Sequence, residues 1–168
     1  MYLFVFFWGP ALSAAHGNSK PDLPYGIIFA SFMASMTVSS LLFNQVMSSG
    51  SVSYTRLMVG ILAVSNVCFF SLVKARSEQT TFWIFCVFEA CVGVYWPCMG
   101  YLKGKLVDDA VRAQVYGILR VPLNIFVVVS LLLTGDGNAY SQVFYTCSML
   151  LLISTGGLLV ASGGQTTV

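Results

Sequence analysis

Charged residues are scarce in this sequence. Asp, Glu, Lys and Arg make up 8% of its 168 residues, whereas a water-soluble domain carries roughly 25%. So few ionisable groups cannot cover the surface of a soluble globule of this size. The net charge is only +2, and no basic patch is present to hold a phosphate backbone. The low charge therefore excludes a soluble domain and a nucleic-acid partner.

Residue patterns typical of catalysis are also lacking. The single histidine, His16, lies in a predicted loop, and the chain has no paired carboxylates, no nucleophile beside a base and no glycine-rich phosphate motif. The five cysteines lie inside apolar blocks, at spacings that indicate neither a disulfide framework nor a metal site. The sequence therefore predicts no enzyme, no cofactor and no metal, and the cysteines are interpreted as small buried thiols.

Long apolar blocks account for most of the chain. Hydrophobic residues make up 57% of it, and most of them gather into blocks of about 17 to 23 residues, close to the ~20 needed to cross ~30 Å of hydrocarbon. Each block is predicted to be a helix, because an unpaired backbone is prohibitively costly in lipid and a barrel strand needs only ~10 residues. Six segments are expected, at 1–15, 25–47, 57–73, 81–101, 113–134 and 141–161.

These segments predict an all-α membrane protein with one domain over residues 1–168. Short connections favour sequential helices as antiparallel neighbours in a compact six-helix bundle. The first segment is several residues too short to span, so we expect the chain to begin partway into a spanning helix, as a fragment would. Basic residues give a weak preference for the 48–56 and 102–112 loops on the cytoplasmic side.

The first and fourth segments share a local pattern of aromatic residues followed by proline. Trp8 precedes Pro10 by two residues, and Tyr95 and Trp96 run directly into Pro97. The two segments are three helices apart and cross the membrane in opposite senses, as in the three-plus-three inverted repeat of a transporter half, where interrupted helices point toward the substrate path. The alternative is coincidence, since proline is common in membrane helices and tryptophan favours their interfaces.

Two ionisable residues are predicted within spanning helices. Glu89 and Arg120 fall in the fourth and fifth segments, at depths that differ by about 8 Å when each helix rises 1.5 Å per residue through a ~30 Å core. A charge at this depth costs at least ~2.5 kcal/mol, so each should face the bundle interior or a water-filled cavity.

Three roles remain open for these charges. Arg120 could bind an anionic substrate, because its planar fork of donors suits oxyanion oxygens. Glu89 and Arg120 could instead form a salt bridge that holds helices together or breaks during switching. Glu89 could also bind and release a proton, because burial disfavours the charged carboxylate. Arg120 reaching the near interface with its long side chain is the remaining alternative.

Polar residues accompany Arg120 on the fifth segment. Pro122 frees backbone carbonyl groups one turn earlier, and Asn124 lies on the same helix face as Arg120. Such a polar stripe is costly in lipid unless it lines a cavity. Asn66, in the third segment, is interpreted as an interhelical hydrogen-bonding residue. A series of small residues on the second segment predicts close helix packing: Ala30, Ser31, Ala34, Ser35 and Ser39.

Four stretches carry a pattern shared with a known family. They are residues 1–12 (MYLFVFFWGPAL), 26–42 (GIIFASFMASMTVSSLL), 88–107 (FEACVGVYWPCMGYLKGKLV) and 116–127 (YGILRVPLNIFV). They resemble the C-terminal half of the molybdate-anion transporters of the major facilitator superfamily. Two parts of these stretches are the most specific. One is a series of an acidic residue, a glycine, an aromatic residue, a proline and a methionine, and the other is an Arg-Val-Pro triplet. They comprise Glu89, Gly93, Tyr95, Pro97 and Met99, with Arg120, Val121 and Pro122.

The resemblance implies a twelve-helix carrier of the plasma membrane, in which these six helices are the seventh to twelfth. It also implies an oxyanion such as molybdate, bound at the midplane between two halves and moved by alternating access. The partners are then the lipid bilayer, the anion, and a missing N-terminal six-helix half or a second copy of this chain. The alternative is a non-transporting scaffold or sensor with a structural Glu89–Arg120 pair. The candidate substrate-binding residues are Arg120, Glu89, Asn124, Trp8, Tyr95 and Trp96, and the candidate helix-break or gating residues are Pro10, Pro97 and Pro122.

Overall fold

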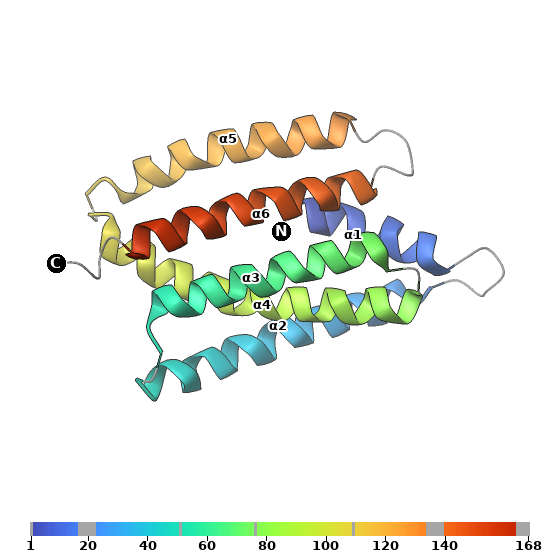
Figure 1. The fold of residues 1–168 in the computed structure, drawn as a ribbon, viewed down its shortest axis with the longest axis horizontal. Helices are drawn as coiled ribbons and strands as arrows, with labels where there is room; N and C mark the ends of the chain where they lie inside the picture. Colours follow the sequence, from blue (N-terminus) through green and yellow to red (C-terminus); the bar gives the residue numbers. More distant parts are fainter. Residues whose placement is uncertain are drawn as a thin grey trace.

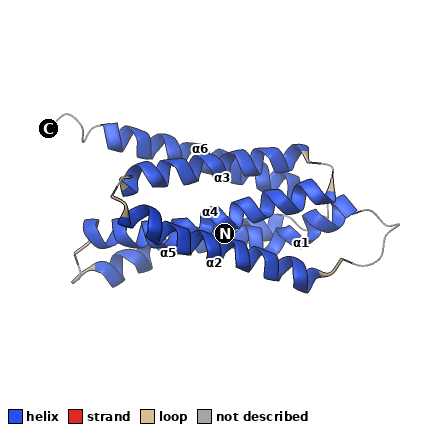
Figure 2. Ribbon diagram, turned by 90° about the horizontal axis from the view of Figure 1, so that it is seen from below, coloured by secondary structure: helices blue, strands red, loops and turns tan. Residues whose placement is uncertain are grey.

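The computed structural model describes residues 2–16, 23–50, 52–75, 77–108, 110–133 and 140–163, which form six α-helices and no strand (Figure 1). The helices are α1 (Tyr2–His16), α2 (Tyr25–Ser48), α3 (Tyr54–Lys74), α4 (Glu78–Leu106), α5 (Arg112–Leu133) and α6 (Tyr140–Gly163). Five of them, α2 to α6, are long and apolar enough to cross a membrane, and α1 is shorter. The predicted all-helical fold is confirmed, and Figure 2 shows helices throughout the described residues.

Several helix ends differ from the predicted bounds. The α3 helix begins at Tyr54, three residues early, because the Ser53 hydroxyl accepts a hydrogen bond from the Arg56 amide at 3.4 Å and caps the first turn. The α4 helix extends to Leu106 and takes two lysines into its last turn, where positive charge favours the helix dipole. His16 lies in the last turn of α1 rather than in a loop. The Gly135–Asn138 turn predicted between α5 and α6 lies outside the described residues.

Helix α4 is the centre of the packing. It lies against α2, α3 and α1, while α6 packs on α3 and touches α1. Of the extensively packed pairs, only α3 and α4 are consecutive, so the expectation that sequential helices are neighbours is wrong for the rest. In lipid, helices associate through close-fitting surfaces and hydrogen bonds, and loop length alone does not choose the partner.

Aromatic side chains fill the core where α1, α2, α4 and α6 meet. The ring of Phe4 lies 5.1 Å from that of Phe85 and 6.0 Å from that of Phe32, measured between centroids. Phe144 of α6 closes the cluster, 6.1 Å from Phe85. All four side chains are buried. Their edge-to-face contacts order the helices by shape and dispersion, which are the main sources of packing energy inside a bilayer.

A polar contact joins α3 to α6, and a close approach at a glycine joins α4 to α2. The Asn66 amide donates to the Ser148 carbonyl oxygen at 2.7 Å, and the Ser148 hydroxyl donates back to Asn66 at 3.3 Å, which confirms the predicted interhelical role of Asn66. Gly93 of α4 lies so close to α2 that a Cβ there would collide with the Met36 carbonyl oxygen and the Ser39 hydroxyl. Ser39 is buried in this contact, as predicted, whereas Ala30 and Ala34 of the same predicted series are exposed, so the prediction is wrong for them.

Candidate functional site

Glu89 is sealed inside the bundle. Its side chain is 0% exposed, and neither carboxyl oxygen has a hydrogen-bond partner among the described residues. Phe85, one turn earlier on α4, and Gly93, one turn later, are buried as well. Because positions four apart share a helix face, Glu89 lies on the α4 face that Gly93 presses against α2.

Arg120 lies in the opposite environment, on α5. No residue of α5 whose side chain the structure describes is fully buried, and Arg120 and Asn124 are both exposed. Pro122 and Ile118 are exposed too, and Ile118 is 71% exposed. The predicted polar stripe therefore lies on a helix surface that no other described helix covers.

The stripe runs alongside the part of α5 that touches the bundle. Helical spacing places Arg120 and Asn124 on one face of α5 with Tyr116, Val127 and Leu131, and we call these five residues the inner face of α5. At one end the Lys103 ammonium lies over the Tyr116 ring, 4.9 Å from its centroid. At the other end Val127 and Leu131 pack on the aromatic core. The inner face thus touches the bundle at both ends and is open between them, at Arg120.

The predicted Glu89–Arg120 pair is not formed in the structure. Helices α4 and α5 are not among the closely packed pairs, and Glu89 lacks any hydrogen-bonding partner among the described residues while Arg120 is exposed. Counting residues along each helix put the two side chains within about 8 Å of each other in depth, but it did not give their lateral separation. In the structure Glu89 lies in the packed interior, whereas Arg120 lies on an open face of α5.

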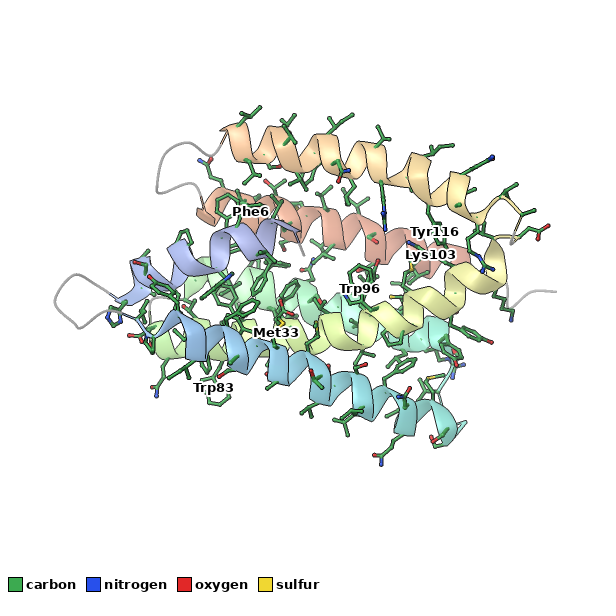
Figure 3. The ribbon with its side chains drawn as sticks, turned by 180° about the vertical axis from the view of Figure 1, so that it is seen from behind. Phe6, Met33, Trp83, Trp96, Lys103 and Tyr116 are labelled. Carbon is green, nitrogen blue, oxygen red and sulfur yellow. The ribbon has the colours of Figure 1, made fainter. Side chains whose placement is uncertain are left out.

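The candidate aromatic residues do not form one site either. Trp8 packs into the aromatic core, with its ring centroid 5.4 Å from that of Phe32. Tyr95 belongs to a second apolar cluster at the other end of α4. Trp96 is 57% exposed, and Figure 3 shows its ring on the side of α4 toward α5. Only Trp96 therefore lies where it could accompany Arg120.

None of the three candidate prolines interrupts its helix. Pro10, Pro97 and Pro122 lie inside α1, α4 and α5, which are each continuous, so the predicted helix breaks are wrong. Proline removes one backbone hydrogen bond, and a helix accommodates this loss by bending. Figure 1 shows such a change of direction in the second half of α4 (yellow), which follows Pro97. A gating role for the prolines stays a prediction.

Contacts that sequence reasoning missed lie at the ends of α4. At its start, Glu78 pairs with His16 of α1, with 2.7 Å between carboxylate oxygen and Nδ1. Beyond its end, Arg112 donates to the carbonyl oxygens of Gly104 and Val107, each at 3.2 Å. The tendency of basic side chains to hydrogen-bond the last carbonyl groups of a helix could have suggested the second contact. The first contact joins residues 62 positions apart and leaves no local signal in the sequence.

Apolar spans, a buried carboxyl group and an arginine on an open inner face together define a multi-pass membrane protein. Comparison with known proteins narrows this class. A major facilitator family model described as sugar transporters with 12 transmembrane segments matches residues 1–81. No solved structure matches the chain significantly.

The chain is similar to curated molybdate-anion transporters. It is 28% identical to that of Takifugu rubripes over 90% of this chain and 34% of the relative. The corresponding values are 28%, 92% and 35% for Xenopus tropicalis, and 27%, 90% and 34% for Danio rerio. The predicted resemblance is confirmed, and the chain spans about a third of the length of the curated relatives it matches.

Proposed function

We propose that this chain is part of a membrane carrier that moves molybdate or a similar oxyanion by alternating access. The similarity to molybdate-anion transporters over about 90% of the chain supports the class of carrier. The observation that carries the choice of ligand is the open inner face of α5, where Arg120 lies between two ends that touch the bundle and no described helix covers it.

The physics of the bilayer explains why this arrangement favours an anion. A guanidinium stays charged at all physiological pH values, and placing it in hydrocarbon costs at least ~2.5 kcal/mol. Arg120 therefore needs water or an anion in the space that its face borders. Its planar donor fork can make paired, charge-assisted hydrogen bonds to two oxygens of a tetrahedral dianion, and Asn124, one turn further, can donate a neutral one.

The remaining part of the carrier supplies the other wall of the path. Because this chain spans about a third of its relatives, we propose that further helices, from an N-terminal half or a second copy, complete the enclosure of Arg120. Alternating access would then alter the distance between the inner face of α5 and the part of α4 that carries Trp96. The plasma membrane is the proposed location.

The test is uptake of labelled molybdate by cells that express the full-length carrier. Arg120→Ala should abolish uptake, and Arg120→Lys should restore part of it, because lysine keeps the charge but not the fork. Arg56→Ala is the matched control, since it removes an exposed arginine from the first turn of α3. Uptake by Arg120→Ala at the control level would refute the binding role. No uptake by the unaltered carrier would refute the molybdate assignment.

A neutral sugar is the second candidate substrate, because the matching family model is described as sugar transporters. Competition separates the two: excess sulfate should inhibit an oxyanion carrier, whereas excess hexose should inhibit a sugar carrier. The scaffold or sensor alternative depended on a structural Glu89–Arg120 pair, which the structure does not form, and we do not favour it.

A further inference from the structure

We propose that Glu89 is a proton-binding site, and that the carrier moves protons together with its anion. The inference rests on the proposed carrier function but concerns a different residue from the anion-binding Arg120. It begins from a carboxyl group that is completely buried and has no hydrogen-bond partner among the described residues.

A charged carboxylate has no compensation in this position. An ion moved out of water is stabilised only by a counter-charge or by several hydrogen bonds, and no hydrogen bond to the Glu89 carboxyl group is found within the described residues. A protonated carboxyl group avoids the charge, and its remaining cost is that of a neutral polar group. The structure therefore describes a conformation in which Glu89 holds a proton.

Among the described residues, the helices packed on α4 bring no side chain of opposite charge near Glu89. Helix α2 has no charged residue, α1 has only His16 in its last turn, and α3 has Arg56 and Lys74 close to its two ends. Within α4, Glu78 and Lys103 lie in the first and last turns. The other titratable groups on these four helices are Tyr2, Tyr25, Tyr54, Cys68, Cys86, Cys91, Tyr95, Cys98, Tyr101 and Lys105. None of these carries a positive charge in the middle of the bundle.

The packing of α4 on α2 supplies a way to release the proton. Gly93 is locked against the backbone of Met36, and Phe85, one turn before Glu89, has its ring 6.0 Å from that of Phe32 of α2, measured between centroids. Glu89 thus lies between two contacts of the same helix pair and is sealed while they persist. Separation of α2 and α4 as the carrier changes state would admit water to Glu89, which favours the charged form and loss of the proton.

Proton binding also suits the charge of the cargo. Moving each elementary charge against a membrane potential adds electrical work, and an oxyanion such as molybdate carries two. Each proton that moves with it cancels one of these charges. A proton gradient can then drive accumulation of the anion. The carrier can adopt the conformation in which Glu89 is sealed without burying a charge, because the protonated carboxyl group is neutral.

Infrared spectroscopy of the purified full-length carrier tests the protonation state without requiring transport. The unaltered protein at neutral pH should show the carbonyl band of a protonated carboxyl group, and Glu89→Gln should lack it. Glu78→Gln, which makes the same change at a partly exposed carboxylate paired with His16, should retain the band. Absence of the band from the unaltered protein, or its persistence in Glu89→Gln, would overturn the proposal.

Proteoliposomes loaded with molybdate test the coupling. Glutamine resembles the protonated carboxyl group, so Glu89→Gln should still exchange labelled for unlabelled molybdate but should lose accumulation driven by a pH gradient. Gradient-driven accumulation equal to that of the unaltered carrier, or equal loss of exchange and accumulation, would reject coupling through Glu89. If the unaltered carrier neither exchanges nor accumulates molybdate, the proposed cargo fails, while the infrared result still decides whether Glu89 binds a proton.

Discussion

Helices α4 and α5 are both apolar spans with one acidic or basic residue in their middle part, yet the burial of these two residues differs completely. Helix α4 is packed against three others and buries Glu89 completely. Helix α5 has no fully buried side chain among those described and leaves Arg120 exposed. A carboxyl group can be neutralised by a proton, whereas a guanidinium cannot lose its charge. The helix that carries the arginine must therefore keep access to water or to an anion.

The largest contrast should come from the same substitution in the two helices. Gly93→Ala places a Cβ against the Met36 backbone, and we expect a loss of about 3 kcal/mol in stability, at the upper end for overpacking. Gly117→Ala in α5 meets nothing within 4 Å and should be neutral or stabilising, by up to about 1 kcal/mol. Unfolding of the full-length protein in detergent measures both. Equal effects would mean that α4 is not locked against α2.

The accessibility of α5 can be measured by thiol labelling in a cysteine-free background. A cysteine replacing Asn124 on the inner face should react with a charged, membrane-impermeant reagent, because thiolate forms only in contact with water. A cysteine replacing Ile125, on the opposite face, should react at least about tenfold more slowly, since apolar surroundings raise the cost of the thiolate. Molybdate should protect only the first. Equal rates, or no protection, would argue against a binding path along this face.

A smaller effect is expected where α3 meets α6. Asn66→Ala removes two hydrogen bonds to Ser148 and should cost about 1 kcal/mol, within the range for polar contacts between membrane helices. Asn44→Ala, at an exposed position of α2, is the matched control and should change stability little. A reversed order in the unfolding of these two variants would contradict the packing of α3 on α6.

The smallest effect concerns the contact that ties α5 to α4. Lys103→Met keeps most of the side-chain length but removes the cation from the Tyr116 ring, and we expect a loss of about 0.5 kcal/mol, as for exposed cation–π pairs. A double-mutant cycle with Tyr116→Leu isolates the interaction. A coupling energy of zero would show that this contact does not fix the start of α5.

The sequence was sufficient to predict the helices but not their partners. Block length and the cost of an unpaired backbone determine that each segment is helical, and the Ser53 cap and the terminal lysines of α4 explain the shifted ends. The depth of a residue in the membrane also follows from its distance in sequence to the end of its helix, and for this reason both Glu89 and Arg120 were identified. Their lateral separation depends on which faces fit together, and that choice is made at positions such as Gly93, which spacing alone did not distinguish from other glycines.

The exposed α5 also bears on how the protein is made. Insertion of a helix through the translocon costs about 2.5 to 3.5 kcal/mol for an arginine at the helix centre. Each Val, Leu or Ile residue of α5 offsets about 0.3 to 0.6 kcal/mol of this cost. We therefore expect α5 to enter the bilayer on its own hydrophobicity but to leave Arg120 uncovered for as long as no other helix packs against it. An uncovered arginine in a membrane helix is then a feature by which cellular quality control could recognise an incompletely assembled protein.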